Sequence, residues 1–316
     1  MPWTQITFYV NSEQALQLSE LLTDAGSVAV TLQDAVSDGI EQPLYEPPLG
    51  ETPLWQTTRV QGLFEADINA DALIAELTAT LEEKFIAGVQ VEHVADKDWE
   101  RECLDNFRPM HFGARLWICP TWHTPPDTDA INLLLDPGLA FGTGTHATTA
   151  LCLEWLATAQ LQDLDVIDYG CGSGILAIAA AKLGARSVWA VDNDPQALQA
   201  TGVNAEKNGL RQQRLAVGDR LPQACALREI IISLPNAGIS AQADLLLANI
   251  LAGPLIDLAP YFATLVRTGG RIILSGILSG QAAGVTEAYA ANFMMAEPVA
   301  RDGWVRLEGR RKSAKV

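Results

Sequence analysis

The segment that most constrains this chain is a run of glycines placed where a buried strand would pass into a helix. It reads VIDYGCGSGIL over residues 166–176, with Gly170, Gly172 and Gly174 at alternate positions. Glycine is required where the backbone turns with positive φ and where a ligand packs directly on main-chain atoms. The run therefore predicts a strand, a tight cofactor-binding loop and a helix.

The spacing of the glycines separates two kinds of cofactor. The dinucleotide fingerprint G-x-G-x-x-G would place its third glycine at position 175, which is Ile175 here. The run follows D-x-G-x-G-x-G instead, with Asp168 two residues before the first glycine. This form resembles the first motif of class I S-adenosylmethionine-dependent methyltransferases, in which no pyrophosphate has to be bound. The resemblance implies that Asp168 and the three glycines contact S-adenosyl-L-methionine, and the alternative is a purely structural turn.

A second acidic residue stands where such a cofactor needs one. The apolar run Ser187–Val191 predicts a short buried strand that ends at Asp192, about 20 residues beyond the glycine loop. In β-α-β nucleotide folds a carboxylate at this distance accepts hydrogen bonds from the ribose hydroxyls. Asp194 precedes Pro195 and is placed to cap the next helix. Capping by Asp194 leaves Asp192 without a structural role, so we expect Asp192 to bind the ribose.

Ahead of the glycine strand, residues 136–149 are rich in glycine and threonine and read DPGLAFGTGTHATT. They predict a flexible loop that closes over the methionine end of the cofactor. The alternative assigns Thr145 as the cap of the following helix, with Thr148 and Thr149 in its first turn. His146 could act as a general base, but a loop histidine near a helix start is more often structural, and it receives no catalytic role.

The stretch Ala243–Leu251 predicts an apolar strand that ends on a polar residue, Asn249. In a parallel sheet this places Asn249 at the same carboxyl edge as Asp168 and Asp192. In DNA-adenine and glutamine methyltransferases the corresponding motif is N-P-P-Y, whose aromatic ring stacks on a planar nitrogen substrate. The run N-I-L-A found here has no such ring. It favours a flexible alkyl amine over a nucleobase as the methyl acceptor.

The chain is strongly acidic, because 38 Asp and Glu against 21 Lys and Arg give a formal net charge of −17. Such a field repels DNA and RNA and attracts a basic protein, although acidity also serves solubility alone. No apolar stretch reaches the roughly 18 residues of a membrane span and no signal-peptide pattern is present, so we expect a cytoplasmic protein. The five cysteines include no C-x-x-C pair, and we expect neither a disulfide framework nor a metal site.

The first 97 residues are predicted to form a separate α+β domain. Its strands and helices follow the order β-α-β-β-α-β, which suits a ferredoxin-like sandwich. The expected elements are Thr4–Val10, Ser12–Ala25, Val28–Gln33, Thr57–Ala66, Asp71–Phe85 and Val89–Ala95. The second helix carries an apolar stripe of Leu73, Leu77 and Leu81, typical of core packing. The proline-rich residues 41–53 are predicted to be a loop.

Residues 98–108 are predicted to form a helical connector to a larger domain over residues 109–316, with residues 120–126 as an alternative boundary. The connector leads to the expected strand Leu116–Cys119. Beyond residue 160, strands near 166, 188, 215, 245 and 272 alternate with helices. An antiparallel pair, residues 294–298 and 304–308, closes the sheet. This pattern predicts a class I methyltransferase, Rossmann-like α/β domain with a seven-stranded sheet.

Taken together, these motifs resemble the ribosomal protein L-eleven methyltransferase (PrmA) family over nearly the whole chain. The matching runs, in family order, are DKDWERECLDNF, LWICP, LDPGLAFGTGTHATT, VIDYGCGSGILAIAA, AVDNDPQAL and LLLANILAGPL. The resemblance implies cofactor contacts at Thr149, Gly170, Asp192 and Asn249. It also implies methylation of lysine side chains and the α-amino group of the ribosomal protein, recognised through residues 1–97, by an enzyme that we expect to be a monomer.

One departure from the family is the length of the segment 220–243, which leaves open whether Asp219 contacts the adenine. The reaction itself is an in-line displacement at a sulfonium carbon, so the protein mainly has to position a neutral amine. Asn249 is the residue expected to orient that amine and is our candidate catalytic residue. Two other functions stay open, a nucleic-acid methyltransferase and a cofactor-binding assembly factor without catalysis.

Overall fold

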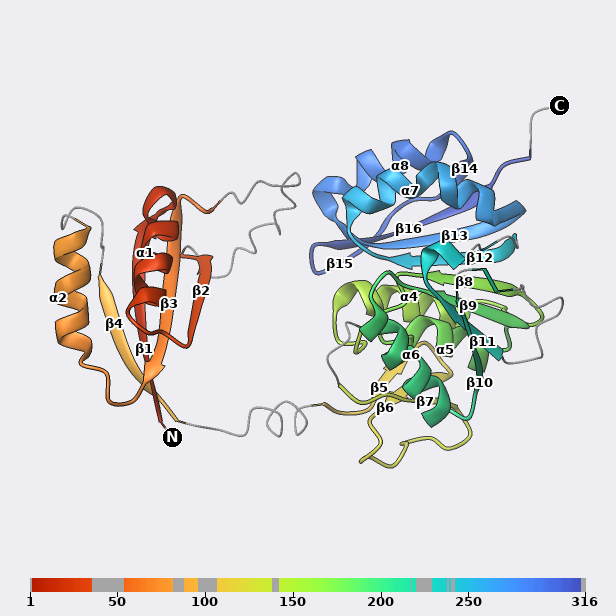
Figure 1. Cartoon of the computed structure of the whole chain (residues 1–316). Helices are drawn as coiled ribbons and strands as arrows, with labels where there is room; N and C mark the ends of the chain where they lie inside the picture. The colour runs from red at the N-terminus through yellow and green to blue at the C-terminus, as the bar shows by residue number, and fades with distance from the viewer. Residues whose placement is uncertain are drawn as a thin grey trace. The chain divides into compact units, whose positions relative to one another are not determined.

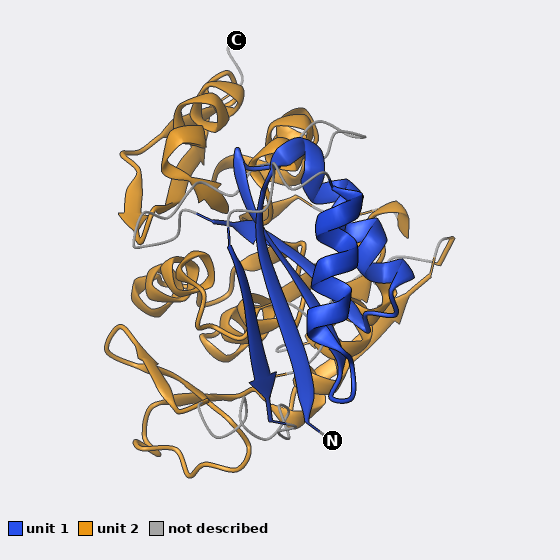
Figure 2. Ribbon diagram, turned by 90° about the vertical axis from the view of Figure 1, so that its left-hand side faces the viewer, with its two compact units in different colours: residues 1–102 blue, residues 103–316 orange. Residues whose placement is uncertain are grey.

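The protein divides into two compact units, which Figure 2 colours separately, residues 1–102 and residues 103–316. The computed structural model describes residues 2–35, 54–81, 88–95, 107–137, 142–216, 218–219, 229–237, 239 and 242–313. The proline-rich loop at 41–53 lies outside the described residues, as does nearly all of the expected connector helix. The two units are considered separately below.

Unit 1 is a four-stranded antiparallel sheet with two helices, in the strand order β2-β3-β1-β4. Its elements are β1 (Trp3–Asn11), α1 (Ser12–Asp24), β2 (Ala29–Asp34), β3 (Thr57–Glu65), α2 (Ala70–Thr80) and β4 (Val89–Val94). This order and these directions are those of the ferredoxin-like sandwich, so the predicted fold of the first domain is confirmed.

The pattern of side chains in unit 1 explains its layers. Every second residue of β1 from Thr4 to Val10 is buried, and the apolar ones meet the buried face of α1. Asn11 ends β1 and caps α1 by accepting a hydrogen bond from the Gln14 amide at 3.0 Å. The predicted stripe on α2 is buried in the same core. That helix ends at Thr80, and the residues predicted to extend it to Phe85 are not described beyond Leu81.

Unit 2 is built on a nine-stranded sheet in the order β10-β11-β9-β8-β12-β13-β16-β14, with β15 paired to β16 (Figure 1). Strands β8 to β13 run parallel to one another, and β16 is antiparallel to β13, β14 and β15. The strands are β8 (Asp165–Tyr169), β9 (Ser187–Val191), β10 (Arg211–Leu215), β11 (Glu229–Ser233), β12 (Ala243–Asn249), β13 (Val266–Leu278), β14 (Phe293–Met295), β15 (Val299–Arg301) and β16 (Trp304–Arg311).

Helices cover both faces of this sheet, as Figure 1 shows. On one face lie α4 (Ala147–Thr158), α5 (Ile175–Lys182) and α6 (Pro195–Lys207), and on the other α7 (Ala252–Leu265) and α8 (Ala282–Ala290). Each set of helices packs into its own buried cluster against the sheet. A three-stranded sheet of β5 (Met110–Phe112), β6 (Leu116–Cys119) and β7 (Ile131–Leu134) joins the first cluster. None of the helices among the described residues is long and apolar enough to cross a bilayer.

The α/β class of unit 2 is as predicted, but the count of seven strands is wrong. One extra strand is β11, whose apolar run Ile230–Ile232 lies in the segment that the sequence analysis left without structure. The other arises because the strand expected over residues 294–298 ends early as β14, and a separate strand, β15, begins after Pro298. Proline cannot donate to a sheet ladder, so it separates the two. A turn with positive φ at Asp302 and Gly303 joins β15 to β16, which pair antiparallel.

Candidate active site

The glycine run forms the predicted turn between β8 and α5. Gly170, Gly172 and Gly174 all have positive φ, at +80°, +54° and +79°. Gly174 is the N-cap of α5 and carries no side chain to close the helix end. A cofactor that packs on this loop therefore meets main-chain atoms.

Helix α6 holds the loop in place through hydrogen bonds that the sequence analysis did not anticipate. The Thr201 hydroxyl donates to the Gly172 carbonyl at 3.0 Å, and the side-chain Nδ2 of Asn204 donates to the Ser173 carbonyl at 2.9 Å. A Cβ added at Gly174 would lie 2.8 Å from a Thr201 carbon, so the helix also packs against the loop backbone. Thr201 and Asn204 are three residues apart and so share one helix face. Nothing in the local pattern marks them as loop partners.

Asp168, on β8, is buried and only half satisfied. Its Oδ2 accepts a hydrogen bond from the Ala177 amide at 2.9 Å, while its Oδ1 is buried with no protein partner. The pKa of Asp168 is raised from 3.8 to about 7, chiefly because the carboxyl is buried. The hydrogen bond from the Ala177 amide opposes this rise, and the negative charge of Asp192 adds to it. A buried oxygen of this kind calls for a donor on a ligand.

Asp192 follows β9 and is bonded to the glycine loop itself. Its Oδ2 accepts from the Gly172 amide at 2.9 Å and its Oδ1 from the Asp194 amide at 3.0 Å. Asp194 in turn caps α6 by accepting from the Gln196 amide at 2.8 Å. The expectation that Asp192 has no structural role is therefore wrong. A carboxylate has about four acceptor sites, so two backbone bonds leave capacity for the two ribose hydroxyls.

Asn249 and Thr149, 100 positions apart in sequence, are in direct contact. The Asn249 Nδ2 donates to the Thr149 hydroxyl at 3.1 Å, and Thr149 is fully buried in the first turn of α4. The Asn249 Oδ1 is buried and has no protein partner. The sheet register pairs Leu247 with Asp168, so Asn249 ends β12 beside the glycine loop. Two buried acceptors, on Asp168 and Asn249, thus serve the same sheet edge.

The start of α4 differs from the expectation in one respect, because its N-cap is His146 and not Thr145. The His146 Nδ1 lies 3.3 Å from the Thr148 amide and 2.8 Å from the Thr148 hydroxyl. The His146 ring also packs edge-on against Trp304, with centroids 4.9 Å apart. These contacts support the structural interpretation of His146.

Asp219 is separated from the site by a strand. It forms a turn after β10, where its Oδ2 accepts from the Ala216 amide at 2.7 Å, but the strand beside β9 is β11. The neighbour of Asp192 at this edge is Ser233, whose carbonyl accepts from the Asp192 amide at 3.3 Å. The end of β11, which the sequence analysis missed, therefore occupies the place considered for Asp219.

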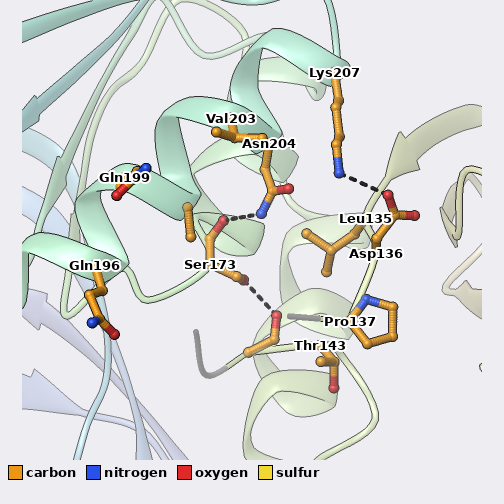
Figure 3. Close-up of a pocket in the computed structure, with 12 residues that line it drawn as sticks. Leu135, Asp136, Pro137, Thr143, Ser173, Gln196, Gln199, Val203, Asn204 and Lys207 are labelled. Carbon is orange, nitrogen blue, oxygen red and sulfur yellow. Dashed lines mark hydrogen bonds and ion pairs between the residues drawn. The ribbon is translucent and has the colours of Figure 1, made fainter. Parts of the chain in front are cut away.

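A cavity of about 410 Å³ adjoins the glycine loop between α6 and the segment before α4 (Figure 3). Ser173 links the two walls, since its hydroxyl donates to the Gly142 carbonyl at 2.6 Å. Across the cavity, Lys207 forms an ion pair with Asp136 at 2.8 Å. Burial alone would raise the pKa of Asp136, but hydrogen bonds from Lys207 and Thr121 hold it below its ordinary value. No cluster of metal-ligand residues occurs in the part of the chain that is described.

Known proteins with this sequence pattern are numerous. The chain matches the family described as Ribosomal protein L11 methyltransferase (PrmA) over residues 2–312. It is 50% identical to the ribosomal protein L11 methyltransferase of Pseudomonas paraeruginosa over 313 residues, 99% of this chain and 100% of that protein. The enzyme of that name from Pseudomonas putida is 49% identical over 317 residues, 99% of this chain and 100% of that protein.

A solved structure supports the same assignment. The ribosomal protein L11 methylase from Lactobacillus delbrueckii subsp. bulgaricus is 34% identical and superimposes with a TM-score of 0.55 over 66% of this chain and 100% of that chain. The sequence match over nearly the whole chain and this likeness of fold agree. The chain belongs to the ribosomal protein L11 methyltransferase (PrmA) family.

Proposed function

We propose that this protein transfers methyl groups from S-adenosyl-L-methionine to amino groups of ribosomal protein L11, on lysine side chains and at the N-terminus. Family membership supports the reaction class. The observation that carries the proposal within the site is the pair of buried, unpartnered oxygens, Asp168 Oδ1 and Asn249 Oδ1, at one sheet edge. Both accept hydrogen bonds, and both substrates of this reaction present N–H groups.

The residues at this edge fit the cofactor. Asp192 would hold the ribose hydroxyls, the backbone of Gly170, Gly172 and Gly174 would face the cofactor closely, and Asp168 would hold its amino group. Thr149 would contribute through the asparagine to which it is bonded. When bound, the cofactor supplies an activated methyl group that already carries its leaving group. The protein therefore has to bind, orient and exclude water.

Asn249 would orient the acceptor amine. Its Nδ2 is engaged by Thr149, which leaves Oδ1 to accept an N–H bond from the amine and to fix the direction of the nitrogen lone pair. A lysine with an ordinary pKa of about 10.4 must first lose a proton, and a partly desolvated site lowers that pKa by disfavouring the ammonium form. Solvent water receives the proton. No side chain in this scheme has to act as a strong base.

The distribution of charge supports a basic protein as the substrate. Residues 1–102 hold 19 acidic and 4 basic residues, a net charge of −15, whereas residues 103–316 hold 19 acidic and 17 basic residues, a net charge of −2. The exposed acids on the described part of unit 1 are Glu13, Glu20, Asp24, Glu65, Asp67, Asp71, Glu76 and Glu92. Such a surface attracts a basic partner and repels nucleic acid. We therefore assign residues 1–97 to substrate recognition.

We also propose which molecules the enzyme binds and where it acts. The methyl acceptor is protein, and neither DNA nor RNA is a direct partner. The enzyme acts as a monomer in the cytoplasm, where its ribosomal protein substrate is found. No membrane partner is needed for this activity.

The deciding experiment is transfer of a labelled methyl group from S-adenosyl-L-methionine to purified protein L11, to ribosomal RNA and to DNA in parallel. Label on L11, with mass shifts at lysines and the α-amine, is the expected result. Label on nucleic acid alone would replace the proposal with a nucleic-acid methyltransferase. Cofactor binding without any transfer would indicate a non-catalytic assembly factor.

A further inference from the structure

Ile250, the residue after Asn249, is held between two glycines from two other strands. A Cβ added at Gly170 would lie 2.2 Å from the Ile250 Cγ2, and a Cβ added at Gly276 would lie 2.2 Å from the Ile250 carbonyl oxygen. Side chains do not approach that closely, so Ile250 excludes a side chain at both positions, in addition to the positive φ that each glycine adopts. The side chain meets the cofactor loop after β8, and the backbone meets β13.

The contact at Gly276 is part of a local irregularity in β13. The pairing of β13 with β16 shifts register between Leu274 and Ile277, and Gly276 has a φ of +85°. Within the same shift, the buried Ser275 donates its hydroxyl to the Thr148 carbonyl at 3.1 Å. The same bulge therefore makes room for the backbone after Asn249 and bonds to the turn that carries Thr149.

The contact with Ile250 is a second reason why residue 170 has to be glycine. The D-x-G-x-G-x-G pattern attributes its small size to the cofactor, but the chain's own isoleucine already occupies the space of a side chain there. The nearest atom is a methyl group of a residue adjacent to Asn249. The distance between the cofactor loop and the catalytic asparagine is thus set by a direct packing contact.

We propose that Ile250 is a positioning residue that holds Asn249 in register with the cofactor loop through its Cγ2 contact with Gly170. The inference rests on the proposed function in one respect, that Asn249 orients the methyl acceptor. The cofactor loop follows β8 and Asn249 ends β12, and these two strands are neighbours. Any widening between the ends of the strands would separate the methyl donor from the amine. A misplacement of about 1 Å is enough to slow such a reaction by about a hundredfold.

The test is a rescue experiment on the full-length protein, with two readouts. Gly170→Ala is expected to weaken binding of S-adenosyl-L-methionine, measured by calorimetry, and to slow methylation of L11, each by about tenfold or more. Adding Ile250→Ala removes the Cγ2 methyl and is expected to recover cofactor affinity by about threefold or more over Gly170→Ala alone. Recovery stops short of the Ile250→Ala single variant, because alanine at position 170 still has to adopt a φ of +80°. That single variant should lower kcat by about tenfold while cofactor affinity stays within about threefold, because register and not binding is lost.

Two matched controls make the rescue specific. Ile250→Val retains the Cγ2 methyl and should fail to rescue Gly170→Ala. In Gly276→Ala the clash is with the Ile250 backbone, so Ile250→Ala should fail to rescue that variant as well. Should Gly170→Ala not fold, recovery of a cooperative thermal transition in the double variant with alanine, but not in the double variant with valine, supports the proposal.

If the Gly170→Ala, Ile250→Ala double variant binds the cofactor no more tightly than Gly170→Ala, the proposal is overturned. Glycine at position 170 is then required by the cofactor and not by Ile250. Rescue of Gly276→Ala by Ile250→Ala would also overturn the proposal. It would mean that removing the Ile250 side chain loosens the packing around it in general and does not act through the Cγ2 contact. If the unaltered protein binds the cofactor but methylates nothing, the proposed function fails while the Gly170 rescue can still be measured through binding.

Discussion

The carboxylate of Asp192 accepts a hydrogen bond from the amide of Gly172 at 2.9 Å, so the acid after β9 is part of the glycine loop after β8. The same side chain is the proposed ribose ligand. Binding of the ribose and the conformation of the loop are therefore linked through one residue.

Two substitutions of Asp192 should weaken cofactor binding by different amounts. Asp192→Asn keeps one acceptor and should raise the dissociation constant for S-adenosyl-L-methionine by about tenfold, whereas Asp192→Ala removes both bonds and should raise it by about a hundredfold. Calorimetry measures both. The matched control is Asp194→Ala, which removes the α6 cap and should cost about 1 kcal/mol of stability with little change in cofactor affinity. Equal losses of affinity in the two positions would contradict a direct role for Asp192.

Removal of the Thr149 hydroxyl should impair catalysis more than cofactor binding. Thr149→Val has nearly the same shape but leaves the Asn249 Nδ2 without its acceptor, so the amide is free to rotate. We expect kcat for L11 methylation to fall by about tenfold and the protein to lose about 1–3 kcal/mol of stability. Thr149→Ser, which keeps the hydroxyl, should retain most of the activity. A Thr149→Val enzyme with normal kcat would show that the hydrogen bond does not hold Asn249 for catalysis.

Asp168 should make cofactor-free stability depend on pH. Its pKa is about 7 in the folded protein against an ordinary value of 3.8, so between pH 4 and pH 7 the folded state binds more protons than the unfolded state. The contribution of this group to stability therefore falls as pH rises through that window and is constant above it. Asp168→Asn cannot ionise, so its thermal midpoint relative to the unaltered protein should rise from pH 4 to pH 7. A pH-independent difference would contradict the shifted pKa.

The same group should make cofactor affinity depend on pH in the opposite direction. An ionised Asp168 attracts the positively charged amino group of S-adenosyl-L-methionine, so affinity should fall as the pH drops below about 7. Asp168→Asn should bind weakly at pH 8 and lose little more at pH 6. Calorimetry at several pH values, in buffers of different ionisation enthalpy, also counts the proton released on binding. Binding of the unaltered protein that is level across this range would rule out the role of the carboxylate.

The acidic surface of unit 1 should act on encounter with L11. Higher salt should lower kcat/KM for L11 and leave kcat and cofactor affinity nearly unchanged, because screening weakens long-range attraction. Neutralising Glu13, Glu20 and Asp24 of α1 should reduce both kcat/KM and its salt dependence. The control neutralises Asp257 and Glu287, exposed acids on α7 and α8 of unit 2, and should change neither. A larger effect from the control pair would place recognition on unit 2.

The sequence predicted the parts of the site that depend on local rules. Glycine spacing, strand ends and the order of strands and helices are written within short windows, and they located the loop and Asn249 correctly beside one another. The family motif implied that Thr149 contacts the cofactor. In the structure the Thr149 hydroxyl accepts a hydrogen bond from Asn249, which gives this threonine a physical role beside the site. These three local patterns needed no information from distant segments.

Other features depend on distant residues and were missed for that reason. Thr201 supports the loop from a helix about 30 positions later, and Ile250 explains Gly170 only once β8 and β12 are paired. His146 was passed over as a helix cap because capping preferences favour short oxygen side chains, and here an imidazole nitrogen takes that role. The extra strand β11 displaced Asp219 from the site, and only the order of strands in space reveals it.

Among the described residues, the buried cluster of unit 1 consists of residues between Ile6 and Leu81, and the two buried clusters of unit 2 include none of these. Natural selection can therefore alter the two units at different speeds. If unit 1 recognises the substrate as we propose, substitutions on the acidic exterior of α1 or α2 change which protein is modified and leave the barrier to methyl transfer unchanged. The chemistry at the end of β12 can be retained through evolution while the target specificity of the enzyme diverges.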